Sequence, residues 1–208
     1  MQANPRNLNG LFGGTLRYVV PIFQRHYVWD EENQWIPLWE DIIEKHKQRL
    51  EKQRTSSHFL GAVILDAVRK QSTREVSRFV VIDGQQRITT IQLILASLRD
   101  FAGEKGIHKL STAIERTLFN PDPELMENEL QEIYKLWPTK FNRKVFCDIL
   151  DAHSYEKVNE AYPIIWKYRK RKPEPRDRLV EAYVIFYTRI KSLYEEGVNT
   201  HSEEEILL

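Results

Sequence analysis

The sequence has a single cysteine, Cys147, among its 208 residues. One thiol excludes an intramolecular disulfide and any zinc finger built on cysteine. The six histidines are scattered and no two lie four residues apart, so the usual histidine spacing of a zinc site is missing. No uncharged apolar run is long enough to span a bilayer, and no early segment resembles a signal peptide. These absences predict a cytoplasmic protein with no membrane partner and no metal site of its own side chains.

Two catalytic motifs are also absent. The sequence has no Gly-x-x-x-x-Gly-Lys-Ser/Thr loop, which argues against a P-loop mechanism. It has no Asp/Glu-x-Lys triplet, which argues against the common carboxylate–lysine core of restriction nucleases. The net charge is only +1, so binding to nucleic acid would need a local basic patch.

The most informative stretch covers residues 79–98. A β-branched apolar run ends in Asp83 and Gly84, and an apolar pattern of helical period follows within a few residues. This pattern predicts a strand, a tight turn and a helix. The first turn of a helix has unpaired N–H groups and the positive end of the helix dipole, so such a turn is suited to bind an anion.

Side chains in this turn suit phosphate chemistry. Gly84 can take a positive φ and let a phosphate approach the backbone, and Arg87 could add a forked cationic donor. Asp83 could accept a proton, orient a water or hold Mg²⁺ through water. The alternative is an ordinary turn with a solvated Arg87.

Residues 24–29 form a second polar and aromatic segment. Gln24 and Arg25 could contact the phosphates or ribose of a nucleotide, while Tyr27 or Trp29 stacks on its base. The alternative for the two aromatic side chains is packing in the core, which we favour for Trp29.

Residues 82–90 resemble the signature of the N-terminal domain of GmrSD-type restriction endonucleases, a domain related to the ParB and sulfiredoxin nucleotide-binding fold. Residues 20–29 and 59–65 resemble two further blocks of that family in the same order and spacing. The resemblance implies binding and hydrolysis of a nucleoside triphosphate, with Mg²⁺ as the expected cofactor. The implied catalytic residues are Asp83, Gln86 and Arg87, and the implied nucleotide-binding residues are Gln24, Arg25, Gly84, Gln85, Thr89 and Thr90.

The remaining pattern predicts the fold class. We expect strands over 18–22, 59–66 and 75–82, the last two paired as a hairpin with a long loop, and an amphipathic helix over 37–50. Later helical patterns cover 110–119, 125–136, 141–150, 155–168 and 179–194. This order predicts an α+β protein: a small mixed sheet with helices over 1–104, ParB/sulfiredoxin-like by resemblance, and an all-helical subdomain over 105–208.

Residues 166–172 form the strongest basic cluster, and two aromatic residues interleave with its cations. Such a cluster could contact a phosphate backbone, although charge runs are more often solvated helix ends. The candidate DNA-binding residues are Lys167, Arg169, Lys170, Arg171 and Lys172.

The expected function is a nucleotide-hydrolysing regulatory module of a prokaryotic DNA-restriction or anti-phage protein, which gates DNA binding or cleavage. Similar proteins often carry a separate HNH nuclease domain, whose motif is not found here, so we expect the nuclease on another domain or subunit. The alternative is a non-enzymatic, nucleotide-gated module that binds DNA or protein. A third possibility is that the helical half is a protein-interaction platform. The preferred nucleotide and any homo-oligomer stay open.

Overall fold

A computed structural model describes residues 4–52, 59–69, 75–166 and 173–197. The predicted DNA-binding cluster at 167–172 lies outside the described residues. The helices are α1 (Leu8–Phe12), α2 (Ile36–Leu50), α3 (Gln85–Glu104), α4 (His108–Leu118), α5 (Glu129–Glu132), α6 (Lys140–Ala152), α7 (Tyr155–Ala161) and α8 (Arg178–Gly197). The strands are β1 (Leu16–Val19), β2 (Ile64–Ala67), β3 (Ser77–Asp83) and β4 (Leu136–Trp137). A π-helical turn (Glu31–Trp35) and a 3-10 turn (Pro123–Leu125) complete the described elements.

The sheet has the strand order β2-β3-β1-β4. β3 pairs antiparallel with β2 and parallel with β1, and β1 also pairs parallel with β4. The sheet is therefore mixed, and the predicted α+β class is confirmed. The antiparallel pairing of β2 and β3 confirms the expected hairpin.

Strand boundaries differ from the prediction on the amino-terminal side of β2. The expected strand over 59–66 begins only at Ile64, because Gly61 has a φ of 99°, which no regular strand contains. β1 ends at Val19, before Pro21, which lacks the N–H that a longer ladder would need.

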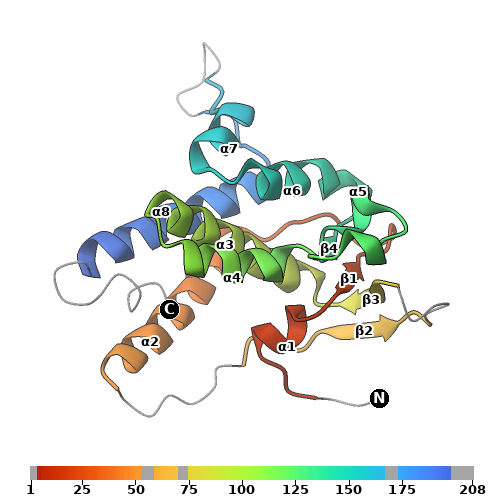
Figure 1. The fold of residues 1–208 in the computed structure, drawn as a ribbon. Helices are drawn as coiled ribbons and strands as arrows, with labels where there is room; N and C mark the ends of the chain where they lie inside the picture. The colour runs from red at the N-terminus through yellow and green to blue at the C-terminus, as the bar shows by residue number, and fades with distance from the viewer. Residues whose placement is uncertain (1–3, 53–58, 70–74, 167–172, 198–208) are drawn as a thin grey trace.

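Helix α3 is the centre of the structure. It packs between α4 and α8, with the sheet to one side of these helices (Figure 1). Ile88, Leu93, Ala96 and Phe101 are all fully buried along it. A helix that is buried on most sides must be apolar around most of its circumference, which explains the long apolar pattern after residue 87.

The second half is mainly helical. The predicted helices over 110–119, 141–150 and 179–194 are confirmed as α4, α6 and α8. The helix predicted over 155–168 ends at Ala161, shortly before Pro163, which disfavours a helical residue at the preceding position.

The helix predicted over 125–136 is wrong. This segment contains only the one-turn α5 and then β4, which pairs with β1. Leu136 is fully buried beside Tyr18 in the sheet, so tertiary packing decides the conformation against a helical pattern. Because β4 lies in the sheet and α8 packs on α3, both halves contribute to one hydrophobic core.

Candidate functional site

The predicted strand, turn and helix are all present at residues 77–104. β3 ends at Asp83, Gly84 has a φ of 91° in the left-handed region, and α3 begins at Gln85. No side chain caps the start of α3, and its first intrahelical hydrogen bond runs from the N–H of Ile88 to the carbonyl of Gly84 at 3.0 Å. The backbone N–H groups of the three residues before Ile88 therefore have no carbonyl partner within the helix.

Position 84 needs a glycine for two reasons, its positive φ and the close approach of neighbouring atoms. A Cβ here would lie 3.1 Å from Val63 Cγ2 and 3.2 Å from the carbonyl oxygen of Ala62. The sequence suggested that the missing Cβ leaves room for a phosphate. In the structure, Ala62 and Val63 take up that room instead.

Arg87 contacts the same segment. Its Nη1 donates a hydrogen bond of 2.6 Å to the carbonyl of Ala62. Gly61, with its φ of 99°, lies directly against the guanidinium, so a Cβ on Gly61 would come within 2.7 Å of Arg87 Cζ. Arg87 thus fixes the chain just before β2. A guanidinium has five N–H donors, so this one bond leaves capacity to bind an anion.

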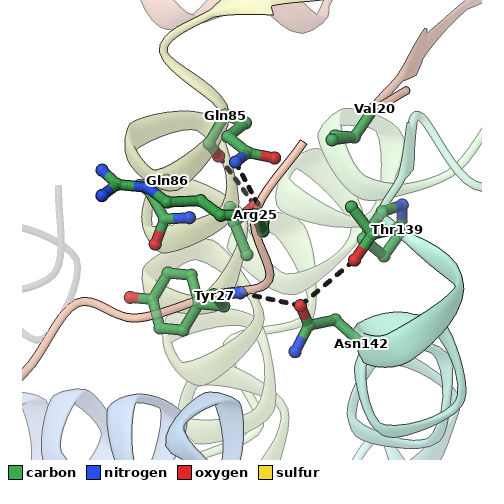
Figure 2. A pocket seen from close by; sticks show the side chains of 9 residues that line it. Val20, Arg25, Tyr27, Gln85, Gln86, Thr139 and Asn142 are labelled. Carbon is green, nitrogen blue, oxygen red and sulfur yellow. Dashed lines mark hydrogen bonds between the residues drawn. The ribbon is translucent and has the colours of Figure 1, made fainter. Parts of the chain in front are cut away.

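Gln85 and Gln86 bind the loop that follows β1. Gln85 Nε2 donates to the carbonyl of Arg25 at 2.9 Å (Figure 2). Gln86 Nε2 donates to the carbonyl of His26 at 3.0 Å, and its Oε1 accepts from the N–H of Val28 at 2.8 Å. Both glutamines are buried, and they satisfy backbone groups that an irregular loop cannot pair itself.

The structure therefore brings Gln24 and Arg25 to the 83–87 turn. Gln24 Nε2 donates to the carbonyl of Ile82 at 3.0 Å, next to the turn. The backbone of Arg25 is anchored on Gln85, while its side chain is exposed and extends away from Thr139 and Asn142 (Figure 2). Asp83 is exposed as well.

Tyr27, Thr89 and Thr90 are buried. The Tyr27 hydroxyl lies 2.6 Å from Thr90 Oγ1 and accepts a hydrogen bond of 2.8 Å from Trp35 Nε1. Burial raises the pKa of Tyr27. Its ring is enclosed, which matches the packing alternative rather than base stacking. The Thr89 and Thr90 hydroxyls donate to the carbonyls of residues 85 and 86 inside α3.

A residue that the sequence did not reveal completes the site. Asn142, in the first turn of α6, accepts a hydrogen bond of 2.8 Å from the N–H of Tyr27 (Figure 2). It lines a small pocket together with Val20, Arg25, Tyr27, Gln85, Gln86, Thr89, Pro138 and Thr139. The pocket has room for about one water molecule, so a nucleotide base does not fit there in this structure. The sequence has no signal for this role, because the burial of Asn142 is visible only in the structure.

Comparison with known families shows to which family the chain belongs. Residues 8–206 match the family described as GmrSD restriction endonuclease, N-terminal domain. The chain belongs to this family. No curated protein matches it. The GmrSD match spans both the sheet and the mainly helical part, so the family resemblance at residues 82–90 extends over nearly the whole chain.

Two further observations describe this GmrSD domain. Within 4–52, 59–69, 75–166 and 173–197, no group of three or more His, Cys, Asp or Glu residues could hold a metal ion. In the same ranges, no helix is both long and apolar enough to cross a membrane.

A cluster of buried charges lies at the other end of α3. Arg99 donates to Asp100 Oδ1 at 2.7 Å, to Glu115 Oε2 at 2.9 Å and to the carbonyl of Leu150 at 2.8 Å. The Tyr183 hydroxyl donates to the second oxygen of Asp100 at 2.6 Å. Arg99 and Asp100 are almost fully buried, and these contacts join α3, α4, α6 and α8. We interpret this cluster as structural, because it holds the four helices together.

Proposed function

We propose that the 83–87 turn binds the phosphates of a nucleoside triphosphate. The domain would hydrolyse that nucleotide with Mg²⁺ and thereby gate DNA binding or cleavage by the nuclease part of a restriction enzyme. The uncapped first turn of α3, which contains Arg87 and holds the backbone of Arg25 through Gln85, is the observation that carries the proposal.

The electrostatics of the turn support an anion. The first N–H groups of α3, which have no acceptor within the helix, add to the positive end of its dipole, and the first turn contains no acidic residue. Arg87 lies within this turn, and Arg25 is anchored beside it through Gln85. A phosphate bound here would gain charge-assisted hydrogen bonds from backbone and guanidinium donors together.

Asp83 is the residue proposed for the chemical step. It ends β3 immediately before the phosphate-binding N–H groups, and its carboxylate is exposed. Mg²⁺ commonly uses one or two carboxylates together with substrate phosphates, so a single carboxylate fits this ion. Positioning and charge stabilisation would supply most of the catalysis.

One observation favours the non-enzymatic alternative. Gln86 was expected to be catalytic, yet both ends of its amide bind the 24–28 loop and its side chain is buried. These loop contacts and its burial leave Gln86 little capacity to orient a water. If Asp83 alone does not suffice, the turn would bind nucleotide as a switch, without hydrolysis.

Phosphate release from a panel of nucleoside triphosphates with Mg²⁺, with and without DNA, tests the proposal. The variants are Asp83→Ala and Arg87→Ala, and the matched controls are Glu124→Gln and Arg116→Ala at exposed positions. Loss of release in both test variants and in neither control is the expected result. Retained turnover in Arg87→Ala would contradict the site.

Nucleotide binding measured by calorimetry on the same proteins separates the two functions. Binding that depends on Arg87, without phosphate release by the wild type, would establish the switch. Absence of both binding and release in folded protein would contradict both functions and point to the helical part as an interaction platform.

A further inference from the structure

A phenylalanine at the beginning of α6 is exposed to solvent. Phe141 is 73% exposed, whereas Phe146, Ile149 and Leu150 of the same helix are fully buried. Burial of one face of an amphipathic helix accounts for these three side chains but not for Phe141. A single exposed apolar side chain is ordinary, so the meaning of Phe141 depends on what lies beside it.

The ring of His26 lies beside Phe141. The two ring centroids are 5.2 Å apart, and the ring planes are inclined by 46°. His26 is exposed as well. We call His26 and Phe141 the ring pair. The ring pair offers solvent an aromatic surface in which each ring is supported by the other.

The ring pair is tied to the beginning of α3. Gln86, in the first turn of that helix, donates from Nε2 to the carbonyl of His26 at 3.0 Å. The N–H of Tyr27 donates to Asn142 Oδ1 at 2.8 Å, which joins the neighbour of His26 to the neighbour of Phe141. The side chain of Gln86 and the residue His26 therefore span the path from the 83–87 turn to the ring pair.

Two other aromatic side chains near the turn are less suited to bind a base. Tyr27 is 4% exposed, and the pocket beside it has room for about one water molecule, so a base does not reach its ring. Phe23 is 81% exposed, but within the described part of the chain no ring contact holds it. The ring pair combines access to solvent with a fixed position.

We propose that the ring pair binds the base of the nucleotide whose phosphates lie at the 83–87 turn. Aromatic side chains stack on bases with little preference for sequence, because every base has a π-face. A ring that a neighbour already holds in place loses little freedom when a base stacks on it. The inference rests on the proposed function, because bound phosphates are needed to bring the base to His26 and Phe141. It adds the part of the site that distinguishes a nucleotide from a bare phosphate chain.

Calorimetric titration of the full chain with two kinds of ligand tests the inference. The first kind is the β,γ-imido analogues of ATP, GTP, CTP and UTP with Mg²⁺, which resist hydrolysis. The second is inorganic triphosphate, which has no base. Phe141→Ala should bind the preferred analogue about tenfold more weakly than the wild type and bind inorganic triphosphate equally well. Phe141→Trp should restore the affinity for that analogue, because stacking needs a ring.

A matched control and a rival residue sharpen the test. Leu130→Ala removes a side chain that is 85% exposed on α5, and it should bind both kinds of ligand like the wild type. Phe23→Ala should also bind like the wild type. Weaker analogue binding by Phe23→Ala, with unchanged binding by Phe141→Ala, would assign the base to Phe23 and overturn the inference.

The remaining outcomes separate this inference from the proposed function. If Phe141→Ala binds all four analogues as tightly as the wild type while Arg87→Ala loses them, the ring pair is excluded and the phosphate site stands. Equal weakening of analogue and inorganic triphosphate in Phe141→Ala would also overturn the inference, because the variant would then act on the phosphate site. Wild-type protein that binds neither kind of ligand would contradict the proposed function together with the inference.

Discussion

Helix α3 has polar groups at both ends, and the two ends differ in how those groups are paired. Near its carboxyl end, Arg99 is 2% exposed and donates to two carboxylates and a carbonyl. At its amino end, Arg87 and Arg25 reach solvent, and the first N–H groups of the helix have no intrahelical acceptor. Saturated buried charges stabilise a fold, whereas accessible unpaired donors can bind a ligand. The difference assigns structure to one end and ligand binding to the other.

The largest expected effect comes from the buried end. Arg99→Ala leaves Asp100 buried without its cation, which should lower the free energy of unfolding by about 3–5 kcal/mol. Urea denaturation followed by circular dichroism measures this loss. The double variant Arg99→Met, Asp100→Leu should recover much of it, because no buried charge is then left unpaired. A loss below about 1 kcal/mol in Arg99→Ala would contradict a structural role.

The next effect concerns Gln86, at the amino end of α3, whose side chain has a structural role beside the proposed phosphate site. Gln86→Ala removes both hydrogen bonds to the 24–28 loop and leaves the Val28 N–H unpaired, which should cost about 2 kcal/mol. Trypsin should then cleave faster after the exposed Arg25. Gln48→Ala in α2, whose amide bonds to Glu44 and Lys45 of the same helix, is the control. Unchanged stability with lost phosphate release would instead make Gln86 catalytic.

Two glycine variants distinguish the effect of backbone strain on nucleotide binding from the effect of moving the Arg87 side chain. Gly61→Ala and Gly14→Ala both force a side chain into a positive φ, which should cost about 1–2 kcal/mol each. A Cβ at Gly14 meets nothing within 4 Å, whereas one at Gly61 strikes Arg87. Calorimetric titration with nucleotide should therefore show weaker binding for Gly61→Ala alone. Equal nucleotide affinities in the two variants would show that Arg87 does not contribute to the site.

The smallest effect concerns a second buried cation. Lys135 is 1% exposed, and its Nζ donates to the carbonyls of Phe12 and Gly14. Burial lowers the pKa of Lys135 from 10.5 to about 8. The unfolded chain then binds more protons than the folded one between these values, so stability rises with pH there.

The expected gain between pH 7 and pH 9 is about 1 kcal/mol. Urea denaturation at both pH values measures it, and Lys135→Met should lack this part of the pH dependence. If the wild type and Lys135→Met instead show the same change in stability between these pH values, Lys135 stays charged in the folded protein.

The sequence predicted those parts of the fold and site that depend on local pattern. The turn at Asp83 and Gly84, the helix after it and the β2–β3 hairpin follow from apolar period and glycine placement, and they are confirmed. The pairing of Gln86 with the 24–28 loop joins residues about 60 positions apart, and the contact of Asn142 with Tyr27 spans 115. A pattern of neighbouring residues cannot predict contacts between residues so far apart in the sequence.

Residue type alone also does not show whether a cation is buried. Arg99 and Lys135 lie in stretches that the sequence predicts as helical, and the structure encloses both and pairs them with backbone carbonyls. β4 is missed for the same reason, because its pairing with β1 depends on a partner that is far away in the sequence.

Amide hydrogen exchange with and without nucleotide and Mg²⁺ tests the central claim most directly, because it compares the two ends of one helix. We predict that added nucleotide slows exchange at the N–H groups of Gln85, Gln86 and Arg87, where phosphate oxygens would accept them, and leaves Arg99 and Asp100 unchanged. Bound nucleotide with no change at Gln85, Gln86 and Arg87 would contradict the assignment of the 83–87 turn as the phosphate site.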